Sequence, residues 1–184
     1  THLRPGNMEL TADFRPRHRF PDSVWIDWRQ GIALNAIALS GPGAQALFLA
    51  KRWQLLKRPF LISYMAVAPT GPQRILETQQ FAEICKRYLW TIKTPVGLQI
   101  NFSCSNCGVD ITPIIEEIQE SLCILAKLGI PLVPKFNLTM PPEMAAEIAA
   151  HPYCDAICQT NAIHWREMAD LIDWDGLFGK NAES

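Results

Sequence analysis

Five short apolar runs alternate with segments of helical periodicity along this chain, and this alternation constrains the fold more than any other feature. The runs lie at 32–39, 60–67, 96–103, 131–136 and 154–160. Alternation of strands and helices predicts parallel strands joined by crossover helices. Strands that are apolar throughout indicate a sheet covered on both faces. A doubly wound sheet and a (β/α) barrel both satisfy this pattern.

The segments between the runs predict the helices. Helical periodicity covers 44–56 and 73–90, and an Ala-rich helix is expected to start in the 139–143 stretch. The first thirty residues are rich in Pro, Arg and aromatic side chains, which predicts an irregular loop region. The whole chain, 1–184, is expected to form a single domain because its length suits one core.

The helix after the third run has the clearest pattern. It is expected to start at about Pro113, with the Thr112 hydroxyl as N-cap and proline where its missing N–H costs nothing. Gly129 is expected to end it. A buried stripe is predicted by apolar residues at three- and four-residue spacing, namely Ile114, Ile118, Leu122 and Leu125.

Composition excludes several classes of protein. Hydrophobic residues make up 48%, charged residues 19%, and the net charge is −1, which fits neither a disordered chain nor a basic nucleic-acid binder. Basic groups at 15–19 and 51–58 are interpreted as solvated faces. No apolar run is long enough to cross a bilayer, and the first residues lack the apolar stretch of a signal peptide. Six cysteines in a chain of this size predict free thiols and a cytoplasmic setting.

Neutral amides recur where the apolar runs end, and carboxylates are nearly absent there. The residues are Asn35, Asn101, Asn106, Asn137 and Asn161, joined by one thiol at Cys104 and one amine at Lys135. Carboxyl ends of parallel strands are where α/β proteins place their sites. Amide side chains offer paired donors and acceptors without charge, which suits a flat ring such as a pyrimidine. The set suits neither hydrolysis by paired acids nor a carboxylate-held metal.

Several of these segments, in the same order along the chain, resemble dihydroorotate dehydrogenases. Asn101-Phe-Ser-Cys-Ser-Asn106 is similar to that family's Asn-x-Ser-Cys-Pro-Asn segment. The other matching segments are Arg4-Pro-Gly-Asn7, Asn35-Ala-Ile-Ala-Leu39, Val133-Pro-Lys135 and Thr160-Asn161-Ala162.

The resemblance implies a (β/α)8 TIM barrel that binds FMN and oxidises dihydroorotate to orotate. Cys104 would be the catalytic base, and its thiol indicates the soluble class rather than a membrane-associated one. Lys135, Asn101 and Thr160 would contact FMN. The pyrimidine would be bound by Asn35, Asn101, Asn106 and Asn161. No metal, nucleic acid or membrane is implied; the expected partners are a second copy of the full-length chain and an electron-transfer subunit.

Two substitutions and the length depart from the family pattern. Ser105 replaces the usual proline, and Ala162 replaces a hydroxyl residue that contacts substrate. A complete barrel has about 250 residues, so the chain is expected to be a fragment, an incomplete FMN-binding barrel of about five βα units.

Three alternatives stay open. The first is a dihydropyrimidine dehydrogenase-like flavin reductase of the same barrel group, against which Asn106 argues. The second is a degenerate, non-catalytic barrel that binds a ligand or partner. The third is a structural zinc domain built on Cys104, Cys107, Cys154 and Cys158, because such a site needs four converging ligands.

Overall fold

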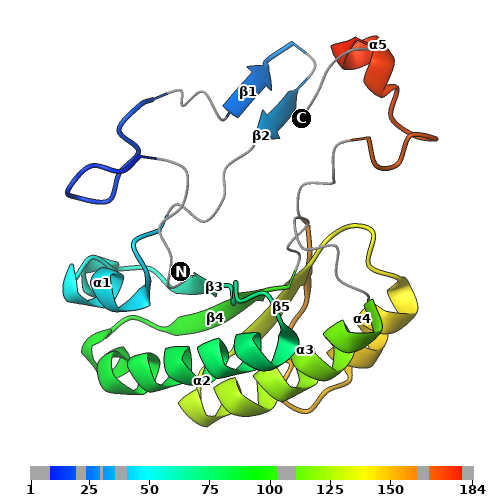
Figure 1. The fold of residues 1–184 in the computed structure, drawn as a ribbon. Coiled ribbons are helices and arrows are strands. Elements are labelled where there is room, and N and C mark those ends of the chain that lie inside the picture. Colours follow the sequence, from blue (N-terminus) through cyan, green and yellow to red (C-terminus); the bar gives the residue numbers. More distant parts are fainter. Residues whose placement is uncertain are drawn as a thin grey trace.

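The computed structural model of the 184-residue chain describes residues 9–19, 24–29, 31–35, 41–102, 111–160 and 166–179. For Trp25, Leu34, Asn35 and residues 111–114 it describes the backbone alone. The fold is α/β: a parallel sheet alternates with helices along the chain (Figure 1).

The parallel sheet has four strands, and their order in space follows their order in sequence. They are β3 (Phe60–Tyr64), β4 (Val96–Asn101), β5 (Leu132–Phe136) and β6 (Cys158–Gln159). The prediction of parallel strands joined by helices is therefore confirmed for four of the five apolar runs. Consecutive order without reversal is the order that a (β/α) barrel uses. The described strands form an open sheet, so closure into a barrel stays a prediction.

Three helices cover one face of this sheet (Figure 1). They are α2 (Gly71–Tyr88), α3 (Ile111–Leu125) and α4 (Pro142–Ala149), and 3-10 turns follow two of them at Leu89–Thr91 and Ala126–Leu128. Crossovers between parallel strands are nearly always right-handed, and strands added in one direction then place successive helices on the same side. Each helix runs antiparallel to the strands, so its first turn lies at their carboxyl end.

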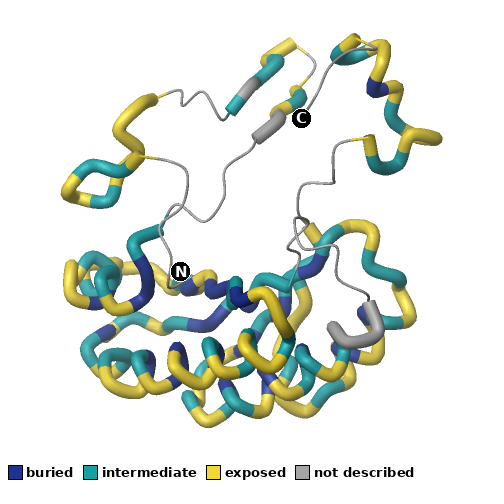
Figure 2. The backbone as a smooth tube through the Cα atoms, in the orientation of Figure 1, coloured by how far each residue is buried: buried dark blue, intermediate teal, exposed yellow. Residues whose placement is uncertain are grey.

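The core lies between these helices and the sheet (Figure 2). The predicted stripe of α3 is confirmed where side chains are described, since Ile118, Leu122 and Leu125 have no exposed surface. Gly129 ends this segment as predicted, with a left-handed φ of 65°. The prediction of Thr112 as N-cap is wrong, because α3 begins at Ile111 and Thr112 lies within its first turn.

The described part of the first apolar run, Ile32–Asn35, does not join the parallel sheet, and the prediction that it does is wrong. β1 (Val24–Asp27) and β2 (Ile32–Asn35) pair antiparallel as a hairpin, so the first thirty residues also contain a strand. The turn explains the pairing. Asp27 Oδ1 accepts a hydrogen bond from the Arg29 amide at 2.8 Å, and Gly31 adopts a φ of 68°. A short turn of this kind returns the chain antiparallel.

Two further elements are shorter than expected. The predicted helix 44–56 is α1 (Ala44–Leu49), a break at Lys51 with a φ of 57°, and a 3-10 turn at Trp53–Leu55. The fifth run forms only the two-residue β6. A last short helix, α5 (Trp174–Phe178), is capped by Asp173, which accepts from the Gly176 amide. None of the helices described here is long and apolar enough to cross a membrane.

Candidate functional site

The face of the parallel sheet opposite the helices carries the polar side chains of the strands. Residues alternate between the two faces of a strand. Ile62, Leu98 and Ile100 face the helices and are buried, whereas Ser63 and Gln99 face the other way. We call this second side the open face.

Strand register arranges the open face in rows. One row holds Ser63, Gln99 and Val133, and the Ser63 Oγ donates to Gln99 Oε1 at 3.3 Å. Paired residues of neighbouring parallel strands point to the same side, so each row forms a line across the sheet.

The next row toward the carboxyl ends holds Asn101, Lys135 and Cys158. All three are half-buried. The sequence predicted that Asn101 and Lys135 share a site, and the register brings them side by side on β4 and β5. The Phe102 amide donates to the Lys135 carbonyl at 3.0 Å, which extends the pairing past the end of β4. Thr160, the third predicted FMN contact, follows β6 directly and is exposed.

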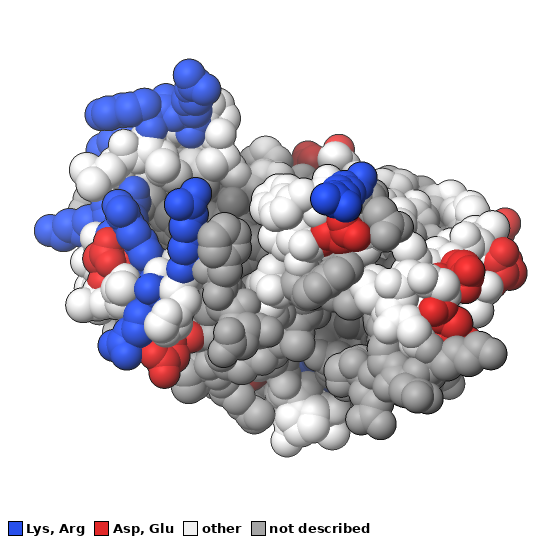
Figure 3. Space-filling view, turned by 90° about the horizontal axis from the view of Figure 1, so that it is seen from above, with Lys and Arg blue, Asp and Glu red and all other residues white. Residues whose placement is uncertain are grey.

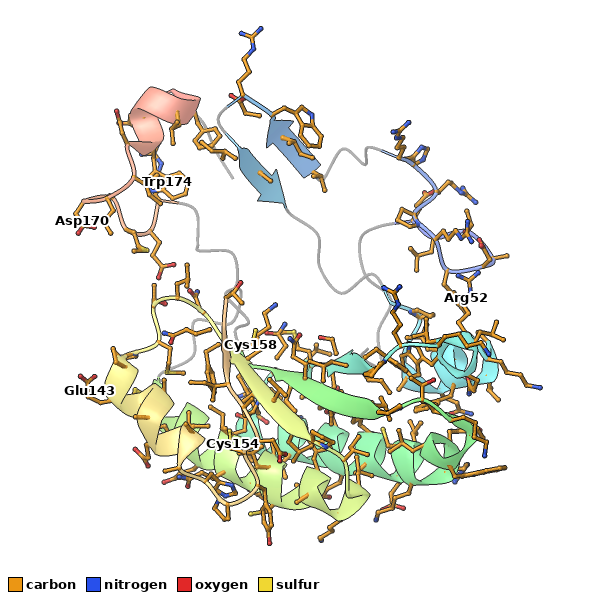
Figure 4. All side chains as sticks on the ribbon, turned by 180° about the vertical axis from the view of Figure 1, so that it is seen from behind. Arg52, Glu143, Cys154, Cys158, Asp170 and Trp174 are labelled. Atoms are coloured by element: carbon orange, nitrogen blue, oxygen red, sulfur yellow. The ribbon has the colours of Figure 1, made fainter. Side chains whose placement is uncertain are left out.

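Cys158 was predicted to be a buried strand thiol or part of a zinc set, and its place beside Lys135 was missed. Figure 4 shows Cys158, the first residue of β6, above Cys154, which precedes this strand in the chain. The signal was available: Cys158 precedes Thr160 by two residues, which puts it on the same face as the strand-end set.

Met65 also belongs to this site and was missed. It follows β3, is 8% exposed, and its Sδ accepts a hydrogen bond from Asn101 Nδ2 at 3.5 Å. It ends the second apolar run, where no polar residue marks a site in the sequence. The Met65–Asn101 contact thus joins the carboxyl ends of β3 and β4 through side chains.

The loop that carries Met65 is held by charged side chains of α2. Glu77 Oε2 accepts from the backbone amides of Val67 and Ala68 at 2.6 and 2.9 Å. Arg74 Nη1 donates to the carbonyls of Ala68 and Pro69 at 3.1 and 3.3 Å. Hydrogen bonds that involve an ionised partner are among the stronger ones in proteins.

The same arginine ties this loop to α3. Arg74 Nη2 and Nε donate to the two carboxylate oxygens of Glu117 at 2.6 and 2.7 Å. The two side chains are 12% and 10% exposed. We call Arg74, Glu77 and Glu117 the loop clamp. Their bidentate and backbone contacts make the loop after β3 a fixed wall of the site.

Two buried groups under the helix-covered face have shifted pKa values. Burial raises the pKa of Tyr64, whose hydroxyl is 3.1 Å from Thr78 Oγ1. Burial also raises the pKa of Cys85 to about 12. A thiol with such a pKa is protonated at neutral pH, so Cys85 has no thiolate to act as a nucleophile.

Charged pairs near the amino terminus lie apart from this site. Arg15 and Arg52 both contact Asp13 at 3.0 Å, and Arg17 contacts Glu9 at 3.0 Å. Figure 3 shows Lys and Arg gathered on one side of that view, over residues 9–19 and the α1 region. Exposed pairs of this kind contribute little to stability because water screens both partners, which agrees with the interpretation of these groups as solvated faces.

Three predicted site residues are not described, and a fourth lies away from the parallel sheet. Cys104, Asn106 and Asn161 lie outside the described residues. Asn35 ends β2 and pairs with Val24 in the hairpin, so it does not follow a strand of the parallel sheet as predicted. Asn101 is therefore the one described member of the substrate set that lies at the carboxyl ends of the parallel sheet.

Lys135 supplies a cation and Asn101 an amide at the carboxyl ends of the strands, and both fit a flat heterocycle that gains negative charge, such as the ring of FMN. No group of three or more His, Cys, Asp or Glu side chains that could hold a metal occurs within the described residues. Cys104 and Cys107, two of the four ligands in the zinc alternative, lie outside the described residues.

A hollow lies at the other end of the sheet from the candidate site. It is an apolar groove of about 750 Å³ at the amino ends of β3, β4 and β5, and we call it the amino-end groove. Leu61, Trp90, Pro95 and Ile130 line it, and Lys93 is its charged residue. None of the predicted site residues lies there.

Comparison of the chain with protein-family models, with curated proteins and with solved structures finds no match in any of the three. The function of the chain is therefore inferred from the side chains at the carboxyl ends of the strands.

Proposed function

We propose that this chain is part of a flavin-dependent dehydrogenase that oxidises dihydroorotate to orotate with FMN. The observation that supports the proposal is the adjacent placement of Asn101 and Lys135 on the open face. Parallel α/β folds place their chemistry at this end of the strands. No carboxylate shares the row that these two residues form with Cys158.

Each residue has a separate role in the proposed reaction. FMN, when bound, accepts the hydride from the substrate ring. The Lys135 ammonium offsets the negative charge that develops on the cofactor, and the Asn101 carboxamide orients the pyrimidine through its polar edge. Cys104, three residues beyond Asn101 in the sequence, takes the proton from the carbon next to a carbonyl. Its thiol must be deprotonated first, since an ordinary thiol has a pKa of about 8.5.

The test is reconstitution of the chain with FMN, followed by anaerobic addition of dihydroorotate. We expect a flavin absorbance band that bleaches with dihydroorotate and less with dihydrouracil. Lys135→Met should slow the bleaching by about tenfold or more, since it removes a charge next to the developing negative charge. Lys127→Met is the matched control, because Lys127 is exposed at the opposite end of the sheet.

Cys104→Ser tests the base, and it should slow bleaching without weakening FMN binding. The proposal is wrong if the chain binds no FMN, or if the bound flavin is not bleached by dihydroorotate. Faster bleaching by dihydrouracil would favour the dihydropyrimidine dehydrogenase-like alternative.

A further inference from the structure

Positive charge flanks the amino-end groove, although the chain as a whole has a net charge of −1. Lys93 lines the groove. Four more exposed cations lie within two residues of its lining segments along the chain, namely Lys57, Arg58, Arg87 and Lys127. No Asp or Glu lies within the same distance of those segments. We call these five cations the basic rim.

The charge of the basic rim is not compensated within the described part of the chain. None of its cations forms an ion pair with a described residue. The cations near the amino terminus differ, because Arg15 and Arg52 contact Asp13, and Arg17 contacts Glu9. A cluster of like charges beside a low-dielectric wall attracts ions of the opposite sign. The basic rim therefore favours an anionic partner.

Trp90 forms an exposed apolar wall of the groove beside Lys93. Its side chain is 72% exposed, and Leu61, which also lines the groove, is 47% exposed. Trp90 Nε1 donates to the Arg87 carbonyl at 2.8 Å, and Lys93 Nζ donates to the Trp90 carbonyl at 3.4 Å. Removal of such apolar surface from water favours the binding of an apolar group. Apolar surface and an ammonium group thus lie next to each other in one hollow.

We propose that the amino-end groove binds a long-chain carboxylate, with the alkyl chain against Trp90 and Leu61 and the anionic head at Lys93. The volume of about 750 Å³ and the mostly apolar lining are typical of a small-molecule site. Burial of the alkyl chain supplies the attraction, and the basic rim selects the negative head over a positive one. This site does not depend on the flavin chemistry proposed for the carboxyl end.

The first experiment is calorimetry on the whole chain with dodecanoate, kept below its critical micelle concentration. We expect a single site. Dodecyltrimethylammonium, which has the same alkyl chain and a positive head, should bind at least about tenfold more weakly because the rim repels it. Octanoate should also bind at least about tenfold more weakly, since each buried methylene contributes to affinity. Equal affinity for the two head groups would overturn the role of the rim.

Variants then locate the site. Trp90→Ala should weaken dodecanoate binding by about tenfold, because it removes the exposed wall. Trp28→Ala is the matched control, since Trp28 is 78% exposed and does not line the groove, and it should bind as wild type does. Urea unfolding of each variant checks that the fold is retained. Equal affinity of Trp90→Ala and wild type would overturn the proposal.

Lys93→Met tests the anionic head. The variant should reduce the preference for dodecanoate over dodecyltrimethylammonium to about threefold or less, since it removes the charge that lines the groove. Lys51→Met is the matched control, because Lys51 is exposed and does not line the groove, and it should keep the wild-type preference. An unchanged preference in Lys93→Met would remove the head group from this position.

Vesicles distinguish a single amphiphile from a membrane surface, because the same charges could contact anionic lipid headgroups. The chain is sedimented with vesicles of phosphatidylcholine alone and of phosphatidylcholine with phosphatidylserine. Binding of free dodecanoate in solution supports the groove as a site for one alkyl chain. Sedimentation with the anionic vesicles, together with no binding of free dodecanoate, would overturn the proposal and assign the basic rim to a bilayer surface.

Discussion

The two ends of the parallel sheet are built from different chemistry. At the carboxyl end, Asn101, Lys135 and Cys158 form a row, and the loop clamp fixes the adjoining loop with charged hydrogen bonds. At the amino end, the groove is lined by Trp90, Leu61 and other apolar side chains, with Lys93 as its charged residue. Both ends belong to the same strands, so the difference comes from the residues at each end and not from the fold.

This difference separates function from stability along each strand. Polar groups at the carboxyl end must stay in place without a large apolar core around them, so charged side chains of α2 and α3 hold them. The amino end is set by close packing, as at Gly97, where an added Cβ would lie 2.8 Å from Leu61 Cδ2 and 3.1 Å from the Pro131 carbonyl oxygen. Substitutions at the two ends should therefore differ in which measurement they change.

The largest effect is expected at the loop clamp. Glu117→Ala removes the carboxylate from Arg74 and leaves a nearly buried guanidinium without its partner on α3. Loss of one member of a buried pair costs about 3 kcal/mol of unfolding free energy. Urea unfolding of the two proteins measures this loss of unfolding free energy. Glu83→Ala is the control, because the Glu83–Lys86 pair is exposed and its loss should change stability by less than about 0.5 kcal/mol. Equal losses of unfolding free energy in the two variants would show that the loop clamp stabilises the chain no more than an exposed ion pair does.

Much of the parallel sheet could be predicted from sequence because each strand there is an apolar run with turn residues on both sides. The α3 stripe was predictable for the same reason: Ile118, Leu122 and Leu125 follow the period of a helix that buries one side. The prediction for the first apolar run was wrong because hydrophobic periodicity indicates burial and does not indicate whether a strand pairs parallel or antiparallel. The Asp27 and Gly31 turn, which sets the antiparallel pairing, occupies only a few residues.

The candidate site was predictable only where a polar residue interrupts an apolar strand end. Asn101 and Lys135 stand out by that criterion, and the register confirms that they are neighbours. Met65 does not stand out, because a methionine after an apolar run is typical of a buried core residue. The loop clamp was also invisible, since Arg74, Glu77 and Glu117 look like surface charges of two helices until the helices are packed together.

A second prediction tests the amino end. Gly97→Ala should destabilise the chain by about 2 kcal/mol, because the new Cβ must displace Leu61 and approach the Pro131 backbone. Flavin and orotate binding should not change once stability is allowed for. Gly71→Ala is the control at the carboxyl end, where the added Cβ meets Glu117 at an ordinary 3.4 Å, and its effect should stay within about 0.5 kcal/mol. A Gly97→Ala variant that loses ligand affinity while it keeps stability would contradict the separation of the two ends.

The smallest effect is expected from the thiol of Cys85, which lies in the last turns of α2, toward the amino end of the sheet. Burial raises its pKa from 9.0 to about 12, so between these values the folded chain keeps a proton that the unfolded chain loses. The stabilisation is complete below pH 9 and is lost as the pH rises toward 12, and from pH 7 to pH 10 it falls by about 1.4 kcal/mol.

Unfolding free energies at pH 7 and pH 10 measure this change, and Cys85→Ala should remove it from the pH dependence, whatever its effect at neutral pH. Cys123→Ala is the matched control, since its thiol is exposed on α3 and the pH dependence should match that of wild type. Tyr64 also has a raised pKa, but its ordinary value of 10.0 makes its contribution begin above the thiol's, so at pH 10 the larger part of the change comes from Cys85. A pH dependence that survives in Cys85→Ala would show that the alkaline sensitivity arises elsewhere, with Tyr64 at the carboxyl end of β3 as the group to replace next.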